Sequence, residues 1–198
     1  MPGVPKLIGY RGHNYRFHYI ITERFGHMTL DKFIMTDSQY SDIRTILQQL
    51  VSIVHRLQDF NILHCNIRCS NIVINCLTLK IILTGFSSCL SLQDNHYYYT
   101  KINRVNSYTL PEWIKFKRFT ANGITVWTIG IILYCLIYKK KPFDSVHSIL
   151  YHKLSFSPST KVSLETLVFL DWCLNKNPKK RMTVEEMKNH PWITELYI

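Results

Sequence analysis

This chain of 198 residues has no recognisable secretion signal and no internal sequence repeats. No charged start is followed by an apolar run, as a signal peptide would require. No segment repeats at a fixed period, and no low-complexity linker divides the chain. With 46% hydrophobic residues, the chain can bury the core of one domain. These observations predict a single intracellular domain, located in the cytoplasm, with the nucleus left open as a second location.

Paired metal-binding cysteines are absent too, because none of the six cysteines forms a Cys-x-x-Cys pair. Without a secretory signal, free thiols are expected rather than disulfides. His64, Cys65 and Cys69 are close in sequence, but no second ligand pair has the spacing of a zinc site. We therefore expect no metal at the cysteines.

Acidic residues are scarce, with 13 Asp and Glu against 24 Lys and Arg, giving a net charge of +11. The cations cluster at residues 115–118, 139–141 and 176–181. Such clusters can bind the phosphates of nucleic acid or acidic proteins. However, no aromatic residue or glycine repeats among the charges, as a base-stacking platform would need. A solvated basic face is the favoured interpretation, and a nucleic-acid-binding protein is the alternative.

Charge is absent from the strongly apolar stretch at residues 125–138. Its apolar residues cover every face of a helical wheel, which predicts a helix buried on all sides. The run is shorter than the roughly 20 residues that cross a bilayer, and Lys139 to Lys141 follow it where a helix end favours cations. We expect a core helix around which the chain packs, and no membrane segment.

The remaining pattern is mixed in the first half of the chain and helical in the second. Strands are predicted over residues 4–10, 16–22, 71–75 and 80–84, and helices over residues 29–34, 41–60, 164–174 and 183–189. The last helix has Thr183 at its N-cap and Glu186 in the capping-box position. Residues 87–110 are polar, rich in tyrosine and without period, so they form a functional or mobile segment. This pattern predicts an α+β fold that is mainly helical.

Several motifs then appear in a fixed order. His64-Cys65-Asn66-Ile67-Arg68-Cys69-Ser70-Asn71 resembles the catalytic loop of protein kinases, His-Arg-Asp-x-Lys-x-x-Asn, and Gly85-Phe86-Ser87 stands where Asp-Phe-Gly would follow. Leu110-Pro111-Glu112 matches Ala-Pro-Glu, and Val126-Trp127-Thr128-Ile129-Gly130 matches the central helix of the large kinase lobe. Residues 108–113 are similar to the Pim serine/threonine kinases in particular. The resemblance covers nearly the whole chain.

The resemblance implies one truncated kinase-like domain over residues 1–198, with small-lobe strands and the hinge in 1–25 and the large lobe in 26–198. The start of the chain looks like the segment just after the regulatory helix of the small lobe. The Gly-rich loop, the strand lysine and the helix glutamate are then expected to be missing. Glu23, Arg24 and Phe25 stand at the hinge positions, where kinases bind the nucleotide.

The resemblance also shows that chemical groups are missing. The carboxylate that would accept the substrate hydroxyl proton is replaced by Asn66, whose amide is a far weaker base. The metal-binding aspartate is replaced by Gly85, and Asn71 alone is a neutral ligand for a metal that one or two carboxylates usually hold. Arg68 keeps a positive charge at the lysine position, although a guanidinium does not replace an ammonium without cost. No cofactor is expected, and ATP with magnesium is expected only if the chain is an active kinase.

Residues with a packing role are retained. His64 and Phe86 keep the two side chains that stack between the lobes of kinases, and Trp127 lies in the central helix. Glu112 and Arg181 resemble the buried ion pair that ties the Pro-Glu segment to the late helices, the alternative being two unrelated exposed charges. This pattern predicts a pseudokinase that binds another protein, such as the small lobe of a kinase that it modulates. The alternatives are a divergent serine/threonine kinase that transfers phosphate from ATP, and the nucleic-acid-binding protein.

Overall fold

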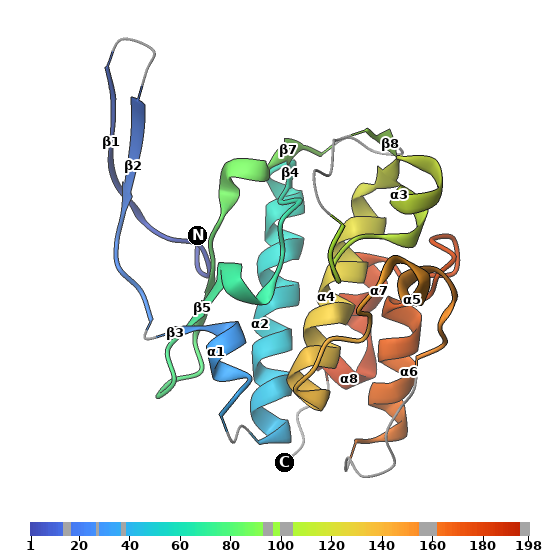
Figure 1. Ribbon diagram of the computed structural model, residues 1–198. Coiled ribbons are helices and arrows are strands. Elements are labelled where there is room, and N and C mark those ends of the chain that lie inside the picture. Colours follow the sequence, from blue (N-terminus) through green and yellow to red (C-terminus); the bar gives the residue numbers. More distant parts are fainter. Residues whose placement is uncertain are drawn as a thin grey trace.

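A helical body carries a two-stranded ribbon that projects from one side (Figure 1). This computed structural model describes residues 1–13, 17–26, 28–36, 39–92, 97–99, 105–154 and 162–194. The helices are α1 (Leu30–Phe33), α2 (Tyr40–Asp59), α3 (Pro111–Phe116), α4 (Ala121–Tyr138), α5 (Val146–Tyr151), α6 (Leu164–Cys173), α7 (Val184–Asn189) and α8 (Pro191–Thr194), with 3-10 turns η1 (Cys69–Asn71) and η2 (Phe86–Ser88). The helical body and its few short strands confirm the α+β class.

The central helix α4 lies in the middle of the body and contacts α2, α6 and α7 (Figure 1). Every residue from Gly123 to Ile137 is buried, which confirms the predicted helix. The helix begins earlier than predicted because the Thr120 hydroxyl accepts a hydrogen bond from the Gly123 amide at 3.0 Å. By length and composition α4 could also cross a membrane, with a mean hydropathy of 1.6 over 18 residues, but 83% of it is buried, as in a core helix.

A glycine allows α4 and α6 to pack closely. A Cβ atom added at Gly130 would lie 2.7 Å from the Cβ of Cys173 and 2.9 Å from the side chain of Leu174. No real side chain tolerates such distances, so this position needs glycine for the two helices to approach. The amphipathic helix α2 covers another side of α4, and its predicted boundaries are correct to within one residue.

The strands that the structure describes form four small antiparallel sheets. They are β1 (Leu7–His13), β2 (Phe17–Thr22), β3 (Met28–Thr29), β4 (Ile62–Leu63), β5 (Ile72–Ile74), β6 (Ile81–Leu83), β7 (Leu90–Ser91), β8 (Tyr97–Tyr98) and β9 (Phe119–Thr120). Among the described strands, β1 and β2 pair only with each other, β5 lies between β3 and β6, and β4 pairs with β7 and β8 with β9. The two predicted strand pairs are therefore confirmed, although β1 begins at Leu7 rather than at residue 4.

Three short helices were not predicted. Helix α3 starts with Pro111 in its first turn, α5 has Ser145 as its capping residue, and α8 follows directly after α7. Each is at most six residues long, so none shows a recognisable apolar period. The capping box of Thr183 and Glu186 at α7 was predicted and is confirmed. Of the segment 87–110, residues 93–96 and 100–104 lie outside the described residues, and η2, β7 and β8 lie within the described part.

Candidate functional site

The loop that resembles a catalytic loop connects β4 to η1, and His64 organises its start. The His64 side chain is only 2% exposed. Its Nε2 donates to the Thr84 carbonyl at 3.0 Å, and its Nδ1 accepts from the Asn66 amide at 3.2 Å. Both ring nitrogens are therefore satisfied by the neutral imidazole with the proton on Nε2. Burial lowers the pKa of His64, against the opposing effect of its hydrogen bond to Thr84.

His64 also contacts Phe86, which follows Gly85 at the start of η2. The two ring centroids are 4.8 Å apart and the planes are inclined by 70°, an edge-to-face arrangement. The structure thus brings together the two residues that the resemblance paired. Their contact holds the loop against the strand β6 and the turn that follows it.

The pH dependence of stability should reveal the neutral state of His64. Because the pKa is lowered on folding from the ordinary 6.5, the unfolded chain binds more protons just below that pH. The contribution of His64 is fully present above pH 6.5 and is lost as the pH falls below it. The free energy of unfolding of a His64→Gln variant, measured by urea denaturation, should therefore fall less on acidification than that of the wild type.

Burial also lowers the pKa of His190, but this residue is present in both chains, so their difference isolates His64. Parallel losses of stability in the two chains on acidification would contradict the assignment.

Asn71 and Gly85 occupy the two positions where the resemblance places metal ligands. The Asn71 side-chain nitrogen donates to the Asn66 carbonyl at 2.9 Å, and the Asn71 carbonyl accepts from the Thr84 amide at 2.7 Å. A Cβ atom added at Gly85 would lie 2.7 Å from that same Asn71 nitrogen. Gly85 also has a φ of +82°, a conformation that other residues rarely adopt. The Asn71 carboxamide therefore occupies the space into which a side chain at residue 85 would extend.

A Gly85→Ala substitution should lower the free energy of unfolding by about 1–3 kcal/mol, because it combines backbone strain with a clash against Asn71. Gly9 provides the matched control. A Cβ atom at Gly9 meets nothing within 4 Å, and its φ is not positive, so Gly9→Ala should leave the stability unchanged or slightly raised. Chemical denaturation of both variants measures the difference, and equal losses would contradict this account.

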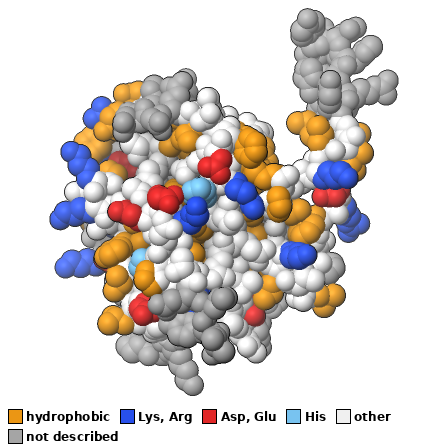
Figure 2. Space-filling model, turned by 180° about the vertical axis from the view of Figure 1, so that it is seen from behind, with side chains coloured by type: hydrophobic (Ala, Val, Ile, Leu, Met, Phe, Trp, Pro, Cys, Tyr) orange, Lys and Arg blue, Asp and Glu red, His pale blue; other side chains and the backbone are white. Residues whose placement is uncertain are grey.

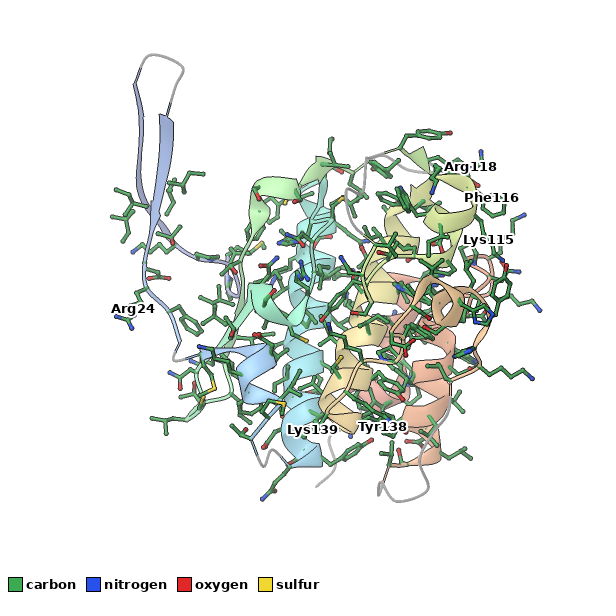
Figure 3. The ribbon with its side chains drawn as sticks, in the orientation of Figure 1. Arg24, Lys115, Phe116, Arg118, Tyr138 and Lys139 are labelled. Carbon is green, nitrogen blue, oxygen red and sulfur yellow. The ribbon has the colours of Figure 1, made fainter. Side chains whose placement is uncertain are left out.

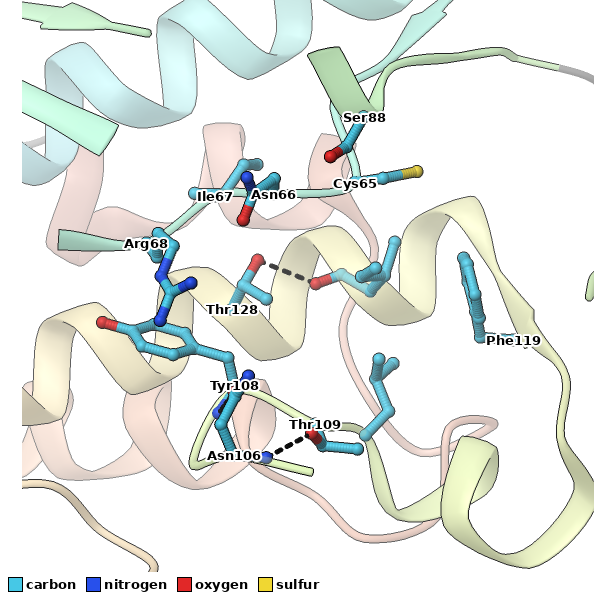
Figure 4. Close-up of a pocket in the computed structure, with 12 residues that line it drawn as sticks. Cys65, Asn66, Ile67, Arg68, Ser88, Asn106, Tyr108, Thr109, Phe119 and Thr128 are labelled. Carbon is cyan, nitrogen blue, oxygen red and sulfur yellow. Dashed lines mark hydrogen bonds between the residues drawn. The ribbon is translucent and has the colours of Figure 1, made fainter. Parts of the chain in front are cut away.

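A pocket of about 400 Å³ opens beside the loop (Figure 4). It brings Asn66 and Arg68 together with the segment that precedes α3. The Arg68 guanidinium lies 5.5 Å from the centre of the Tyr108 ring, and the Tyr108 hydroxyl accepts from the Cys69 amide at 3.2 Å. Tyr108 had been noticed in the sequence only as part of the Pim-like segment. Its role in the pocket depends on a contact across 39 residues, which no local pattern shows.

Cys65 also lines this pocket, but its thiol is a poor nucleophile. Burial, together with the neighbouring Cys89, raises the pKa of Cys65 to about 12. The thiol therefore stays protonated at neutral pH, and the thiolate is the reactive form of cysteine. Within the described part of the chain, no three His, Cys, Asp or Glu side chains are placed to hold a metal ion.

Glu112 and Arg181 form a buried ion pair, as the resemblance implied. Two parallel bonds join them, Nη1 to Oε1 at 2.8 Å and Nη2 to Oε2 at 3.0 Å. Arg181 also donates to the Gly123 carbonyl at 2.9 Å and to the Asn175 carbonyl at 3.0 Å. Its guanidinium lies 5.0 Å from the centre of a Trp127 ring. The pair thus ties α3, α4 and the segment before α7 together.

The basic cluster at residues 176–181 is only partly solvated, which corrects the expectation of a solvated face. Besides the buried Arg181, Lys176 is partly buried, 3.7 Å from the centre of the Phe143 ring, and donates to the carbonyls of Ser148 and Ile149. Desolvation, and then the charges of Arg181 and Lys115, lower the pKa of Lys176 to about 8. Lys176 and Arg181 are therefore packed against other side chains, whereas Lys179 and Lys180 are exposed to solvent.

The hinge-equivalent residues lie apart from the loop. Glu23 and Phe25 line a separate pocket of about 860 Å³ with the first seven residues and with α2. Arg24 is exposed and points away from the helical body (Figure 3). Neither Asn66, Asn71 nor Gly85 lines this pocket, so the structure does not join the hinge and the loop into one site.

Comparison with known proteins matches residues 4–193 to the protein kinase domain. This chain belongs to the protein kinase family. It is 30% identical over 152 residues to the serine/threonine-protein kinase pim-2 of Danio rerio, covering 77% of this chain and 48% of that protein. It is 29% identical over 194 residues to the calcium/calmodulin-dependent protein kinase cmkB of Emericella nidulans, covering 90% of this chain and 48% of that protein. It is also 31% identical over 151 residues to the PAS domain-containing serine/threonine-protein kinase of Mus musculus, covering 76% of this chain and 11% of that protein.

The similarity to a Pim kinase agrees with the motif at residues 108–113. This kinase-family chain spans about half the length of the pim-2 and cmkB proteins. Its own kinase-like loop differs from the motif at the positions of the proton-accepting and metal-binding carboxylates, where it has Asn66 and Gly85.

Proposed function

We propose that this chain is a pseudokinase, that is, a kinase-family domain that transfers no phosphate and acts by binding another protein. The bound protein is another kinase, whose activity this chain modulates. The observation that carries the proposal is the arrangement of Asn71 and Gly85. Phosphoryl transfer depends on positioning and on charge stabilisation by carboxylate-bound magnesium. Here the Asn71 carboxamide, bonded to the Asn66 carbonyl, fills the space beside a residue without a side chain.

The composition of the pocket supports the same conclusion. None of the twelve described residues lining the pocket beside the loop is an aspartate or glutamate, so none of these side chains combines proton acceptance with magnesium binding. The residues present do not fit magnesium with ATP, and we expect this binding to be weak or absent. The buried pair of Glu112 and Arg181 and the contact of His64 with Phe86 maintain the fold independently of that chemistry.

The ribbon of β1 and β2 supports the protein-binding part of the proposal. Large apolar side chains are exposed on it, with Leu7 56%, Ile8 66%, Ile20 75% and Ile21 53% exposed. Because neighbours along a strand point to opposite faces, both faces of the ribbon are apolar. Within the described residues, neither outer edge of the ribbon pairs with another strand. A two-stranded ribbon with these properties is barely stable alone in water.

An apolar hollow lies at the base of the ribbon. It measures about 370 Å³ and is lined by side chains from the ribbon, from the end of α2 and by Phe86, among them Leu7, Ile20 and Phe60. Figure 2 shows hydrophobic side chains gathered where the ribbon meets the body. Exposed apolar surfaces of this kind mark sites of protein association. The small lobe of another kinase is the partner that we propose for this surface.

The test compares capture of purified kinase domains by the wild type with capture by an Ile20→Lys variant. Burying a lysine in an apolar interface costs several kcal/mol, so we expect capture to fall by at least about tenfold. Leu77→Lys is the matched control, because Leu77 is 87% exposed in the turn between β5 and β6, away from the ribbon, and should bind as the wild type does. A wild-type chain that is monodisperse, binds no hydrophobic dye and captures no kinase domain would defeat the proposal.

A further inference from the structure

The pocket beside the kinase-like loop contains one cation and no anion among the residues that the structure describes. It is lined by residues 65–68 of the loop, by Ser88, by the segment from Asn106 to Leu110, and by β9 and α4. Among the twelve described residues that line it, only Arg68 is charged, and the other polar groups are amides, hydroxyls and a thiol. This lining attracts a negatively charged ligand, and none of these side chains carries a negative charge that would repel it.

Arg68 is held ready for such a ligand. Its guanidinium lies over the Tyr108 ring (Figure 4). The Tyr108 hydroxyl is in turn fixed by a hydrogen bond from the Cys69 amide. No carboxylate or carbonyl within the described part of the chain accepts a hydrogen bond from this guanidinium. Arginine presents five N–H donors in a planar fork that matches phosphate oxygens in pairs. The stacking contact orients that fork while its donors stay available.

The wall of the pocket belongs to a cationic segment. Between residues 105 and 128 the charged residues are Glu112, Lys115, Lys117 and Arg118, and the carboxylate of Glu112 is engaged by Arg181. The three cations are exposed, and Arg118 precedes Phe119 of the pocket wall (Figure 3). Their positive potential adds to that of Arg68 and favours an acidic ligand.

The form of the pocket favours a side chain over a nucleotide. Its volume of about 400 Å³ is within the usual range for sites that hold small ligand groups. The two aromatic rings in its lining are poorly placed for a base to stack on, because Arg68 lies over one face of Tyr108 and Phe119 is only 1% exposed. Polar groups at Asn66, Ser88 and Asn106 supplement Arg68 as donors.

We propose that this pocket binds a phosphorylated serine or threonine side chain of another protein, with the phosphate paired to the Arg68 guanidinium. The inference rests on the proposed function, that this chain binds another protein. It adds that the partner carries a phosphate group, which binds in this pocket and not at the ribbon of β1 and β2. The asparagine at position 66 then has a positive consequence. With an amide in place of a carboxylate there, the kinase-like loop does not repel a bound phosphate.

The test measures binding of the wild-type chain to two fluorescent degenerate peptide libraries, identical except that the central serine or threonine is phosphorylated in one. Fluorescence anisotropy should show at least about tenfold tighter binding of the phosphorylated library, as a charge-assisted bidentate contact provides. Arg68→Ala should remove this preference. Arg24→Ala, which deletes an exposed guanidinium at the hinge, is the matched control and should keep it.

Asn66→Asp is a second variant that keeps the size of the side chain. It places a carboxylate in the pocket with Arg68, so binding of the phosphorylated library should also weaken by about tenfold. Circular dichroism spectra matching the wild type would show that both variants are folded.

Three results would overturn the inference: equal binding of the two libraries by the wild type, a phosphate preference that survives in Arg68→Ala, or displacement of the peptides by metal-free ATP or inorganic phosphate at lower concentration than by unlabelled phosphopeptide. The Ile20→Lys variant separates this inference from the proposed function. Loss of kinase capture in Ile20→Lys, with no phosphopeptide binding by the wild type, would leave the proposed function standing and the pocket without this role.

Discussion

Replacement of Arg181 by methionine is expected to lower the free energy of unfolding by about 3–5 kcal/mol, because it leaves a buried carboxylate without its partner. Glu112 is 5% exposed and Arg181 is 4% exposed, and both oxygens of the carboxylate are bonded to the guanidinium. Arg181 also satisfies the carbonyls of Gly123 and Asn175, which would lose these donors. Methionine preserves much of the side-chain volume, so the loss reports the polar contacts. Urea denaturation followed by circular dichroism measures it.

A double-mutant cycle identifies the ion pair as the cause. Glu112→Gln should be destabilising alone, and its combination with Arg181→Met should cost less than the two single losses added together. The exposed contact of Glu185 with His55 provides the control, because Glu185→Gln there should leave the midpoint nearly unchanged. Strict additivity in the cycle, or an effect at Glu185 as large as that at Arg181, would contradict the structural role of the pair.

Trp127→Ala should lower the free energy of unfolding by about 3–5 kcal/mol, as truncation of a fully buried aromatic residue does. Trp127 is 0% exposed, and its ring stacks on Phe143 at a centroid distance of 5.5 Å with the planes inclined by only 7°. The ring also makes cation–π contacts with the charged groups of Arg181 and Lys176. The cavity left by alanine would therefore disturb α4 and the ion pair at once.

Two other variants test this explanation. Trp172 is 49% exposed on α6, so Trp172→Ala should cost far less. The indole nitrogen of Trp127 has no hydrogen-bond partner among the described residues, so Trp127→Phe should lose only packing area and fall between the wild type and alanine. A Trp127→Ala chain as stable as Trp172→Ala would show that the stacked cluster does not carry the core.

The long helices could be predicted because the pattern of apolar residues within each segment is enough to indicate a helix. The run at residues 125–138 has no polar face, and α2 repeats its apolar residues at helical spacing, so both helices were predicted. The boundaries of α2 were correct to within one residue, whereas α4 begins four residues before the predicted start. The caps of α7 were visible as a pair of residues three apart. Helices α3, α5 and α8 are too short to show such a pattern. Their positions depend on a proline in the first turn, a serine cap or a preceding helix.

The candidate site was predictable only in part. The order of the motifs gave the family and located Asn66, Arg68, Asn71 and Gly85. It did not show that Asn71 fills the space beside Gly85, since this depends on the backbone angle of one glycine. The partner of Arg68, Tyr108, lies forty residues further along the chain, and Lys176 looked like any surface lysine until Phe143 and two carbonyls surrounded it. Contacts between distant segments were the part that sequence patterns could not supply.

The central claim, that this kinase-family domain performs no phosphoryl transfer, is tested most directly by thermal unfolding with and without ATP and magnesium. A ligand at about 100 times its dissociation constant would stabilise the folded chain by about 2.7 kcal/mol. The account predicts cooperative unfolding at the same temperature in both conditions. A clear upward shift that requires both ATP and magnesium, and that disappears in an Asn71→Ala variant, would contradict the account and reopen the interpretation as a divergent kinase, to be tested by phosphate transfer to a basic peptide.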